Sequence, residues 1–137
     1  MEEHHQLSDT EFAEQFSRAT LKPALFSHEA HLRLAWIHLR RYGKHQAEQN
    51  IPEQLQHFVT SLGARDKYNA TLTLAAVKAV HHFILKSRSD NFPDFIREFP
   101  QLKHNFKGLL ACHYGFDIYR SERAKREFLT PDLLPFD

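Results

Sequence analysis

Apolar residues along this chain recur at intervals of three and four, the spacing that places them on one face of an α-helix. No stretch alternates between apolar and polar residues for long enough to predict a β-strand. Ser8 and Glu11 have the spacing of a capping box, and Gly43 and Gly63 each follow an amphipathic stretch. The pattern therefore predicts an all-α fold with helices at residues 8–18, 27–42, 44–62, 70–88, 93–99, 105–114 and 121–128.

These helices are expected to form a single domain over residues 8–137, a helical bundle of about five to seven helices of which two or three are long. Residues 1–7 are expected to be a flexible tail. Pro52 lies inside the third helix, which either bends there or restarts with Asn50 as its cap. The C-terminal stretch 130–137 is expected to lie extended over the core.

Composition narrows the classes of function. Eighteen Lys and Arg against seventeen Asp and Glu leave a formal net charge of +1, whereas nucleic-acid binders usually carry a strong basic excess. Cys112 is the only cysteine, which suits a reducing compartment, and a small buried side chain is expected there. The N-terminus lacks an apolar signal segment, and no apolar run approaches the ~20 residues of a membrane helix. We therefore expect a cytoplasmic protein, monomer or homodimer, with no nucleic-acid or membrane partner.

The stretch "FSHEAHLRLAWIHLRRYG", residues 26–43, contains three of the eleven histidines. At 100° per residue, His28, His31 and His38 fall along the apolar face of the predicted helix. His28 and His31 are separated by ~4.5 Å along the axis, so one ion or ligand could touch both. His38 lies ~10.5 Å from His31 along the axis, and a structural role is expected for it.

The same stretch resembles a zinc-protease helix only superficially. That motif spaces its histidines by four residues and places a glutamate beside them. Here the spacing is three, and Glu29 falls roughly 160° from His31, on the expected solvent side with Arg33. Glu29 is therefore not expected to act as a base, and His4 and His5, in the expected tail, are not counted among the site candidates.

The helix predicted at 70–88 supplies an opposite wall for this site. It is apolar on two sides, which is typical of a central helix. His81 is expected to point into the core. Asn69 and Thr73 share an edge between the two apolar sides, so both are expected to be buried and to need hydrogen-bond partners.

Four stretches, "FSHEAHLRLAW", "KYNATLT", "ACHY" and "AKREFLTPDLLP", occur in this order from Phe26 to Pro135. They resemble the motifs F-x-H-x-D-H-hydrophobic-R-x-A-W, Y-H-E-T-hydrophobic-T, an aromatic pair and a P-D-x-x-P-like tail, in a family of small, uncharacterised bacterial proteins. The resemblance implies no particular activity. It does imply a set of site residues, here His28, His31, Tyr68, Thr71, Thr73, His113 and Tyr114.

The resemblance also implies a metal site that this chain lacks in part. In the family pattern the histidine and glutamate of Y-H-E-T would complete a set of three histidines and one carboxylate, which suits Zn, Fe or Mn. Asn69 and Ala70 stand at those two positions, and Ala30 replaces the aspartate of the first motif. Either the metal does not belong to the family, or this member binds it weakly, recruits His81 or His113, or has lost the activity.

Two readings of function follow. In the first, a site between the helices at 27–42 and 70–88 binds a metal ion or a small molecule. His28 and His31 are then metal ligands or, with His113, catalytic candidates, and the ligand-binding residues are Tyr68, Asn69, Thr73, His81 and Tyr114. In the alternative, the histidines form a hydrogen-bonded core in a non-catalytic interaction or dimerisation module, with Trp36 and Ile37 as contacts. The sequence leaves open whether the protein is an enzyme.

Overall fold

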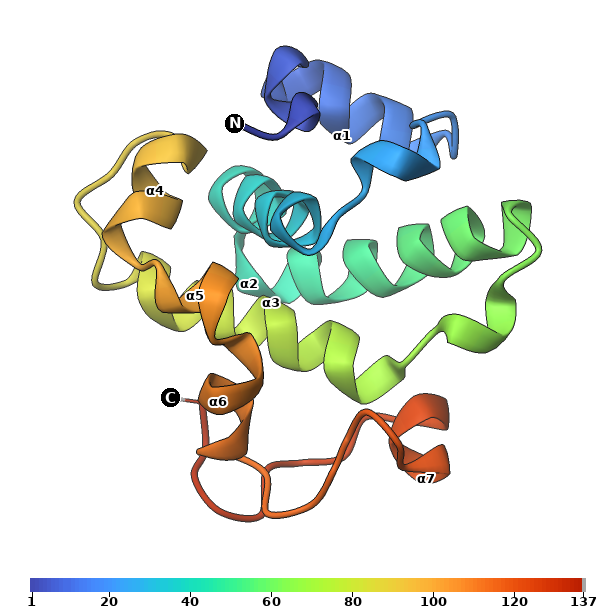
Figure 1. Cartoon of the computed structure of the whole chain (residues 1–137), viewed down its shortest axis with the longest axis vertical. Coiled ribbons are helices and arrows are strands. Elements are labelled where there is room, and N and C mark those ends of the chain that lie inside the picture. Colours follow the sequence, from blue (N-terminus) through green and yellow to red (C-terminus); the bar gives the residue numbers. More distant parts are fainter. Residues whose placement is uncertain (137) are drawn as a thin grey trace. The chain divides into compact units, whose positions relative to one another are not determined.

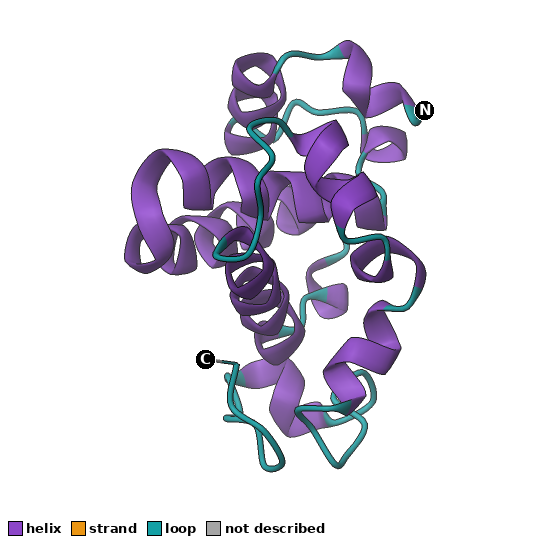
Figure 2. Ribbon diagram, turned by 90° about the vertical axis from the view of Figure 1, so that its left-hand side faces the viewer, coloured by secondary structure: helices purple, strands orange, loops and turns teal. Residues whose placement is uncertain are grey.

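The computed structural model describes residues 1–136, and all regular structure in them is helical (Figures 1 and 2). This confirms the predicted all-α fold. Within these residues, no helix is long and apolar enough to cross a membrane. The α-helices are α1 (Asp9–Ser17), α2 (His28–Ser61), α3 (Ala70–Ile84), α4 (Phe92–Glu98), α5 (Gln101–His104), α6 (Phe106–Ala111) and α7 (Glu122–Arg126), and the 3-10 helices are η1 (Glu3–Gln6), η2 (Pro23–Leu25) and η3 (Arg65–Lys67).

The chain divides into two compact units, Met1–Tyr68 and Asn69–Asp137. The sequence predicts one domain over residues 8–137 after a short tail. In the structure, the N-terminal residues belong to the first unit, and the division falls just before α3.

Helix α2 bends sharply at Gly43, which has non-helical dihedral angles of φ 84° and ψ 169°. A positive φ of this kind is the conformation that glycine adopts most readily. The bend separates a first arm, residues 28–42, from a second arm, residues 44–61, which Figure 1 shows end-on and in the plane of the page respectively. The break predicted at Gly43 is thus confirmed, whereas the helix continues through Pro52.

Helix α1 packs against both arms of α2. The Arg33 guanidinium of the first arm lies 4.8 Å from the centre of the Phe12 ring. The Phe58 ring of the second arm stacks on Phe16 at 4.9 Å. In a straight helix Arg33 and Phe58 would be ~37 Å apart, whereas Phe12 and Phe16 are separated by one turn, ~6 Å. The bend at Gly43 therefore brings together residues that a continuous helix would hold far apart.

The N-terminal residues, expected as a flexible tail at residues 1–7, form a 3-10 helix that packs within the first unit. Residues 3–6 form η1, and only 1 % of the His4 surface is exposed. Helix α1 then begins with the predicted capping box, in which the Ser8 hydroxyl accepts from the Glu11 backbone and the Glu11 carboxylate accepts from the Ser8 backbone. This fixes the direction in which the chain leaves η1.

In the second unit, Asn69 caps α3 because its side-chain oxygen accepts from the Leu72 N–H. The helix ends at Ile84, before the predicted residue 88, and Leu85 is exposed although the sequence pattern places it on the apolar side. Helix α7 packs against α3. The Thr71 hydroxyl joins the two segments by donating to the Glu127 carbonyl at 2.7 Å.

The helix predicted at 105–114 is shorter in the structure and ends as α6 at Ala111. Cys112 follows the last turn and is exposed, so the expectation of a small buried side chain there is wrong. The C-terminal stretch covers the core only in part. Phe136 is buried and stacks on the His113 ring at 4.1 Å, whereas Leu133 and Leu134 are exposed.

Candidate functional site

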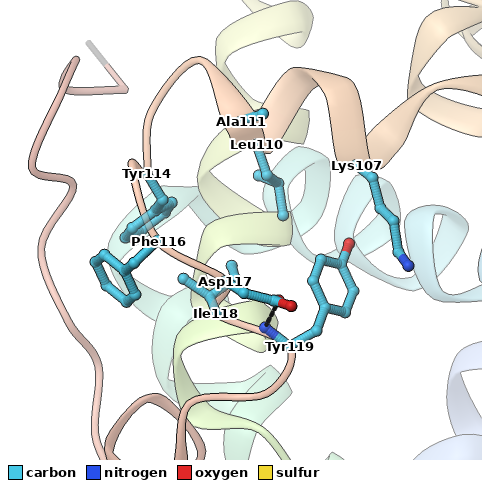
Figure 3. A pocket seen from close by; sticks show the side chains of 8 residues that line it. All are labelled: Lys107, Leu110, Ala111, Tyr114, Phe116, Asp117, Ile118 and Tyr119. Carbon is cyan, nitrogen blue, oxygen red and sulfur yellow. Dashed lines mark hydrogen bonds between the residues drawn. The ribbon is translucent and has the colours of Figure 1, made fainter.

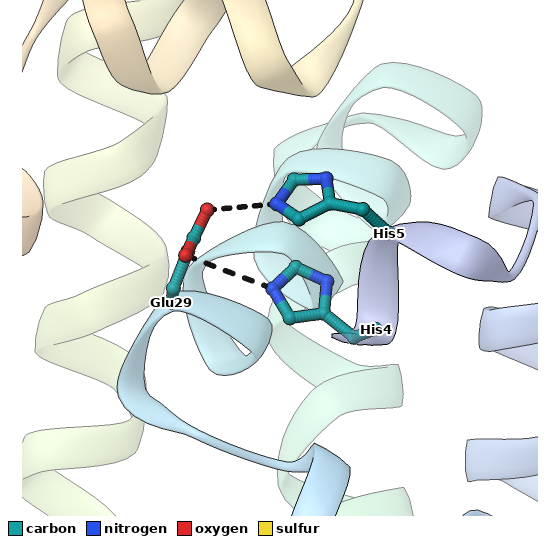
Figure 4. A group of neighbouring side chains, drawn as sticks. All are labelled: His4, His5 and Glu29. Atoms are coloured by element: carbon teal, nitrogen blue, oxygen red, sulfur yellow. Dashed lines mark hydrogen bonds and ion pairs between the residues drawn. The ribbon is translucent and has the colours of Figure 1, made fainter. Parts of the chain in front are cut away.

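The first unit contains a histidine–carboxylate cluster formed by His4, His5 and Glu29 (Figure 4). The two histidines come from η1, and the glutamate comes from the first turn of α2. One nitrogen or oxygen atom from each side chain lies within 4.8 Å of the others. Among the described residues, this is the one group of three histidine, cysteine or acidic side chains with the spacing of a metal site.

The closest pair in the cluster is His5 and Glu29. The His5 Nε2 atom lies 2.9 Å from Glu29 Oε1, and a carboxylate can only accept, so the His5 N–H donates to it. The His4 Nε2 atom lies 3.9 Å from Glu29 Oε2, beyond hydrogen-bond distance. Glu29 and His4 are buried, so the carboxylate faces two imidazoles in a site that is largely closed to water.

Arg33 holds the N-terminal segment against α2. Its guanidinium donates to the carbonyl oxygens of His4 at 2.6 Å and Leu7 at 2.8 Å, and forms an ion pair with Asp9 at 2.9 Å. It also lies 3.3 Å from His4 Nδ1. Because guanidinium has no acceptor, this His4 nitrogen accepts and Nε2 carries the proton of the neutral ring. The His4 N–H therefore points toward the carboxylates.

Glu2 supplies a second carboxylate beside the cluster. Its Oε1 atom lies 3.6 Å from His4 Nε2 and accepts a short hydrogen bond from the Ser27 hydroxyl. Ser27 is also the N-cap of α2, where its hydroxyl accepts from the Ala30 N–H. The cap of α2 and the cluster are thus connected through one hydroxyl group.

The predicted faces of the first arm are wrong in three respects. Glu29 and Arg33, expected in solvent, are 4 % and 5 % exposed. His28, expected on the buried face, is exposed. Trp36 and Ile37, proposed as surface contacts, are buried. The physical reason is that η1 and the start of α1 cover the side of the arm that the sequence pattern leaves to water.

His38 is buried in the first unit, and His31 is half-buried. The His31 ring lies 5.6 Å from Phe26, and its Nε2 is buried with no hydrogen-bond partner among the described residues. Burial, and then the nearby His28, lower the pKa of His31 to about 4. Burial, and then Arg41, lower the pKa of His38 to about 4. The Asn50 amide donates to His38 Nδ1 at 3.3 Å, which agrees with the structural role predicted for His38.

The other predicted site residues lie across both units. Tyr68 ends the first unit, beside the Arg65 guanidinium, and the rest belong to the second. There the Asn69 amide donates to the Ile118 carbonyl at 2.8 Å, and the Thr73 hydroxyl donates to the Asn69 carbonyl at 2.7 Å.

These two contacts confirm that both residues are buried with partners. His81 is half-buried. The His113 ring contacts the Leu134 carbonyl through Nδ1 at 2.7 Å, and the Tyr114 hydroxyl donates to the Leu129 carbonyl at 2.8 Å. Most of these polar groups are therefore engaged by the backbone of their own unit.

The sequence contains one signal for the burial of this side of α2. In the stretch "HLRLAWIHL", Arg33 is the only charged residue, and apolar residues surround it on every side of the helix. A helix that is apolar all round is typical of a buried element, and a buried arginine requires partners. Glu29 lies one turn earlier on the same side. The pattern does not identify the segment that covers this side, which in the structure is η1, far away in the sequence.

Comparison with protein-family models, with curated proteins and with solved structures finds no match for this chain. The structure itself defines the class, an all-α protein with a buried histidine–carboxylate cluster in its N-terminal unit. The family resemblance of the sequence, and the residue roles that it implies, stay predictions.

Proposed function

We propose that the first unit binds a divalent transition-metal ion through His4, His5 and Glu29. The observation that supports the proposal is the convergence of two imidazole nitrogens and one carboxylate oxygen within 4.8 Å. Imidazole and carboxylate ligands suit Zn²⁺, Fe²⁺ and Mn²⁺. This keeps the metal class expected from the sequence and moves its ligands from His28 and His31 to the N-terminal cluster.

Two of the three ligand separations are close to those of a metal site. Ligands about 2.0–2.2 Å from a tetrahedral zinc ion lie about 3.4 Å from one another. The His5–Glu29 separation is 2.9 Å and the His4–Glu29 separation is 3.9 Å, so both lie close to that value. The ion would take the place of the Nε2 proton that His5 donates to Glu29, and the proton of the neutral ring would then sit on Nδ1. Glu2 or water would complete the coordination.

Arg33 makes His4 the weakest of the three ligands. If His4 binds the ion through Nε2, its remaining proton moves to Nδ1, which faces an Arg33 N–H at 3.3 Å. Two donors cannot bond to each other, so that contact must lengthen on binding. Arg33 keeps its stronger bond to the His4 carbonyl. We therefore expect the loss of His5 or Glu29 to weaken metal binding more than the loss of His4.

The test is elemental analysis of protein purified without a histidine tag, followed by thermal shift with Zn²⁺, Fe²⁺ and Mn²⁺. His5→Ala and Glu29→Gln should abolish both bound metal and the thermal shift. His28→Ala and His31→Ala serve as matched controls, because they replace the same residue type in the same unit, and they should retain the metal.

Two results would overturn the proposal. One is less than about a tenth of an equivalent of metal with no thermal shift, since a site that binds the folded state must stabilise it. The other is loss of metal in the His28 and His31 variants alone, which would restore the location predicted from the sequence.

A further inference from the structure

We propose that the second unit binds a small zwitterionic aromatic compound, a molecule with one aromatic ring, one carboxylate and one amine, in a hollow at the end of α6 (Figure 3). The hollow has a volume of about 240 Å³. It is lined by Lys107, Leu110, Ala111, Tyr114, Phe116, Asp117, Ile118 and Tyr119. All of these residues lie in α6 or in the segment that follows it, so the site belongs to a single unit.

Part of the lining is aromatic. The Tyr114 and Phe116 rings meet edge to face, with centroids 5.7 Å apart and planes at 85°. Leu110 and Ile118 are buried and contribute apolar side chains to the lining. Phe116 is 40 % exposed, so part of its surface is open to a ligand. Aromatic rings prefer this edge-to-face geometry, and a ligand ring can extend the same arrangement.

The lining also carries one positive and one negative group. The Lys107 ammonium lies 4.8 Å from the centre of the Tyr119 ring and has no carboxylate partner among the described residues. The Asp117 carboxylate accepts from the Tyr119 backbone N–H at 2.9 Å, and its other oxygen lies 3.8 Å from the exposed Arg120 side chain. A ligand carboxylate complements Lys107, and a ligand ammonium complements Asp117.

The geometry of the hollow is held by its own hydrogen bonds. The Tyr114 hydroxyl donates to the Leu129 carbonyl at 2.8 Å, and the Asp117 carbonyl accepts from the backbone of Ser121 at 3.1 Å. Burial, and then Asp132, raise the pKa of Tyr114 to about 12, so its hydroxyl remains a donor. A site that is ordered before binding loses little entropy when the ligand arrives.

The volume sets the size of the ligand. Pockets for drug-sized molecules measure about 300–1,000 Å³, and a volume of about 240 Å³ holds roughly eight waters. A single-ring molecule fits this space, whereas a nucleotide or a multi-ring cofactor does not. L-Phenylalanine is therefore a suitable probe, together with two analogues that each lack one charge, 3-phenylpropionate and 2-phenylethylamine.

The experiment is titration of the full chain with each probe, followed by calorimetry and by NMR shifts of the Phe116 and Tyr119 amides. L-Phenylalanine should bind about five- to tenfold more tightly than either analogue, because each charge contributes one charge-assisted contact. Lys107→Met should remove the advantage over 2-phenylethylamine, and Asp117→Asn should remove the advantage over 3-phenylpropionate. Lys86→Met, an exposed lysine outside the hollow, is the control and should bind like the wild type.

The proposal is wrong if none of the probes binds at about 10 mM, a concentration at which even weak single-ring ligands are detected. It is equally wrong if all three bind with the same affinity, because the charges would then contribute nothing. Both substitutions are of exposed side chains, and Asp117→Asn keeps an oxygen for the Tyr119 N–H. Both variants should therefore fold like the wild type, and any change in their probe affinities reports on the hollow.

Discussion

Replacing His31 with a residue that does not titrate should reduce the acid sensitivity of the first unit. The His31 ring is part of an aromatic cluster with Phe26, and its Nε2 is buried. Burial, and then His28, lower its pKa from 6.5 to about 4. The folded chain therefore resists the proton that the unfolded chain accepts.

The direction and the size of the effect follow from these two pKa values. As the pH falls below 6.5, the unfolded chain takes up a proton at His31 and the folded chain does not until about pH 4. Stability is therefore lost on acidification across this window. At 1.36 kcal/mol per pKa unit, the loss from pH 7.5 to pH 5.0 is about 2 kcal/mol for His31 alone. His38, with a similarly lowered pKa, adds a separate loss.

The assay is urea unfolding of the wild type and of His31→Gln at pH 7.5 and pH 5.0, followed by the fluorescence of the buried Trp36. His31→Gln can lose stability at both pH values because its packing differs. The informative quantity is the change in the free energy of unfolding between the two pH values, which should be about 2 kcal/mol smaller in the variant. A second variant, His31→Phe, should show the same reduction. An unchanged pH dependence in both variants would refute the reasoning.

Two further substitutions test the packing of the first unit. Arg33→Ala should lower the free energy of unfolding by roughly 3–5 kcal/mol, because it leaves Asp9 and two carbonyl oxygens without their buried donor. Arg41→Ala, which removes an exposed arginine of the same helix, should cost less than about 1 kcal/mol. If the two variants lost the same stability, Arg33 would not hold the N-terminal segment against α2 as described. Gly43→Ala should cost about 1–3 kcal/mol from backbone strain alone, since no atom lies within 4 Å of the added Cβ. Urea unfolding measures this loss of stability. A Gly43→Ala variant as stable as the wild type would show that the bend does not need the φ of 84° at this position.

The local features of the fold could be predicted where a few neighbouring residues determine them. The capping box at Ser8 and Glu11 and the break at Gly43 both depend on interactions within four residues. The burial of Thr73 was also predictable, because its hydroxyl bonds to a carbonyl in the preceding turn. These features require no knowledge of what packs against the helix.

The cluster could not be predicted in the same way, because its contacts join residues that are far apart in the sequence. Glu29 meets His5 across 24 positions, and Arg33 meets His4 across 29. A helical wheel assigns a charged residue to solvent unless another segment is known to cover it. The apolar surroundings of Arg33 indicate burial, but they do not identify η1 as the segment that supplies its partners.

The bend at Gly43 has a consequence for which changes in chain length the first unit can accept. Phe58 reaches Phe16 only when the second arm leaves the bend with the correct rotation. Inserting one residue between 44 and 57 would turn Phe58 by about 100° and remove it from that contact. An insertion in the loop after Ser61 would leave both arms in register. Variation in length is therefore expected beyond the second arm, while the distance from Gly43 to Phe58 stays constant.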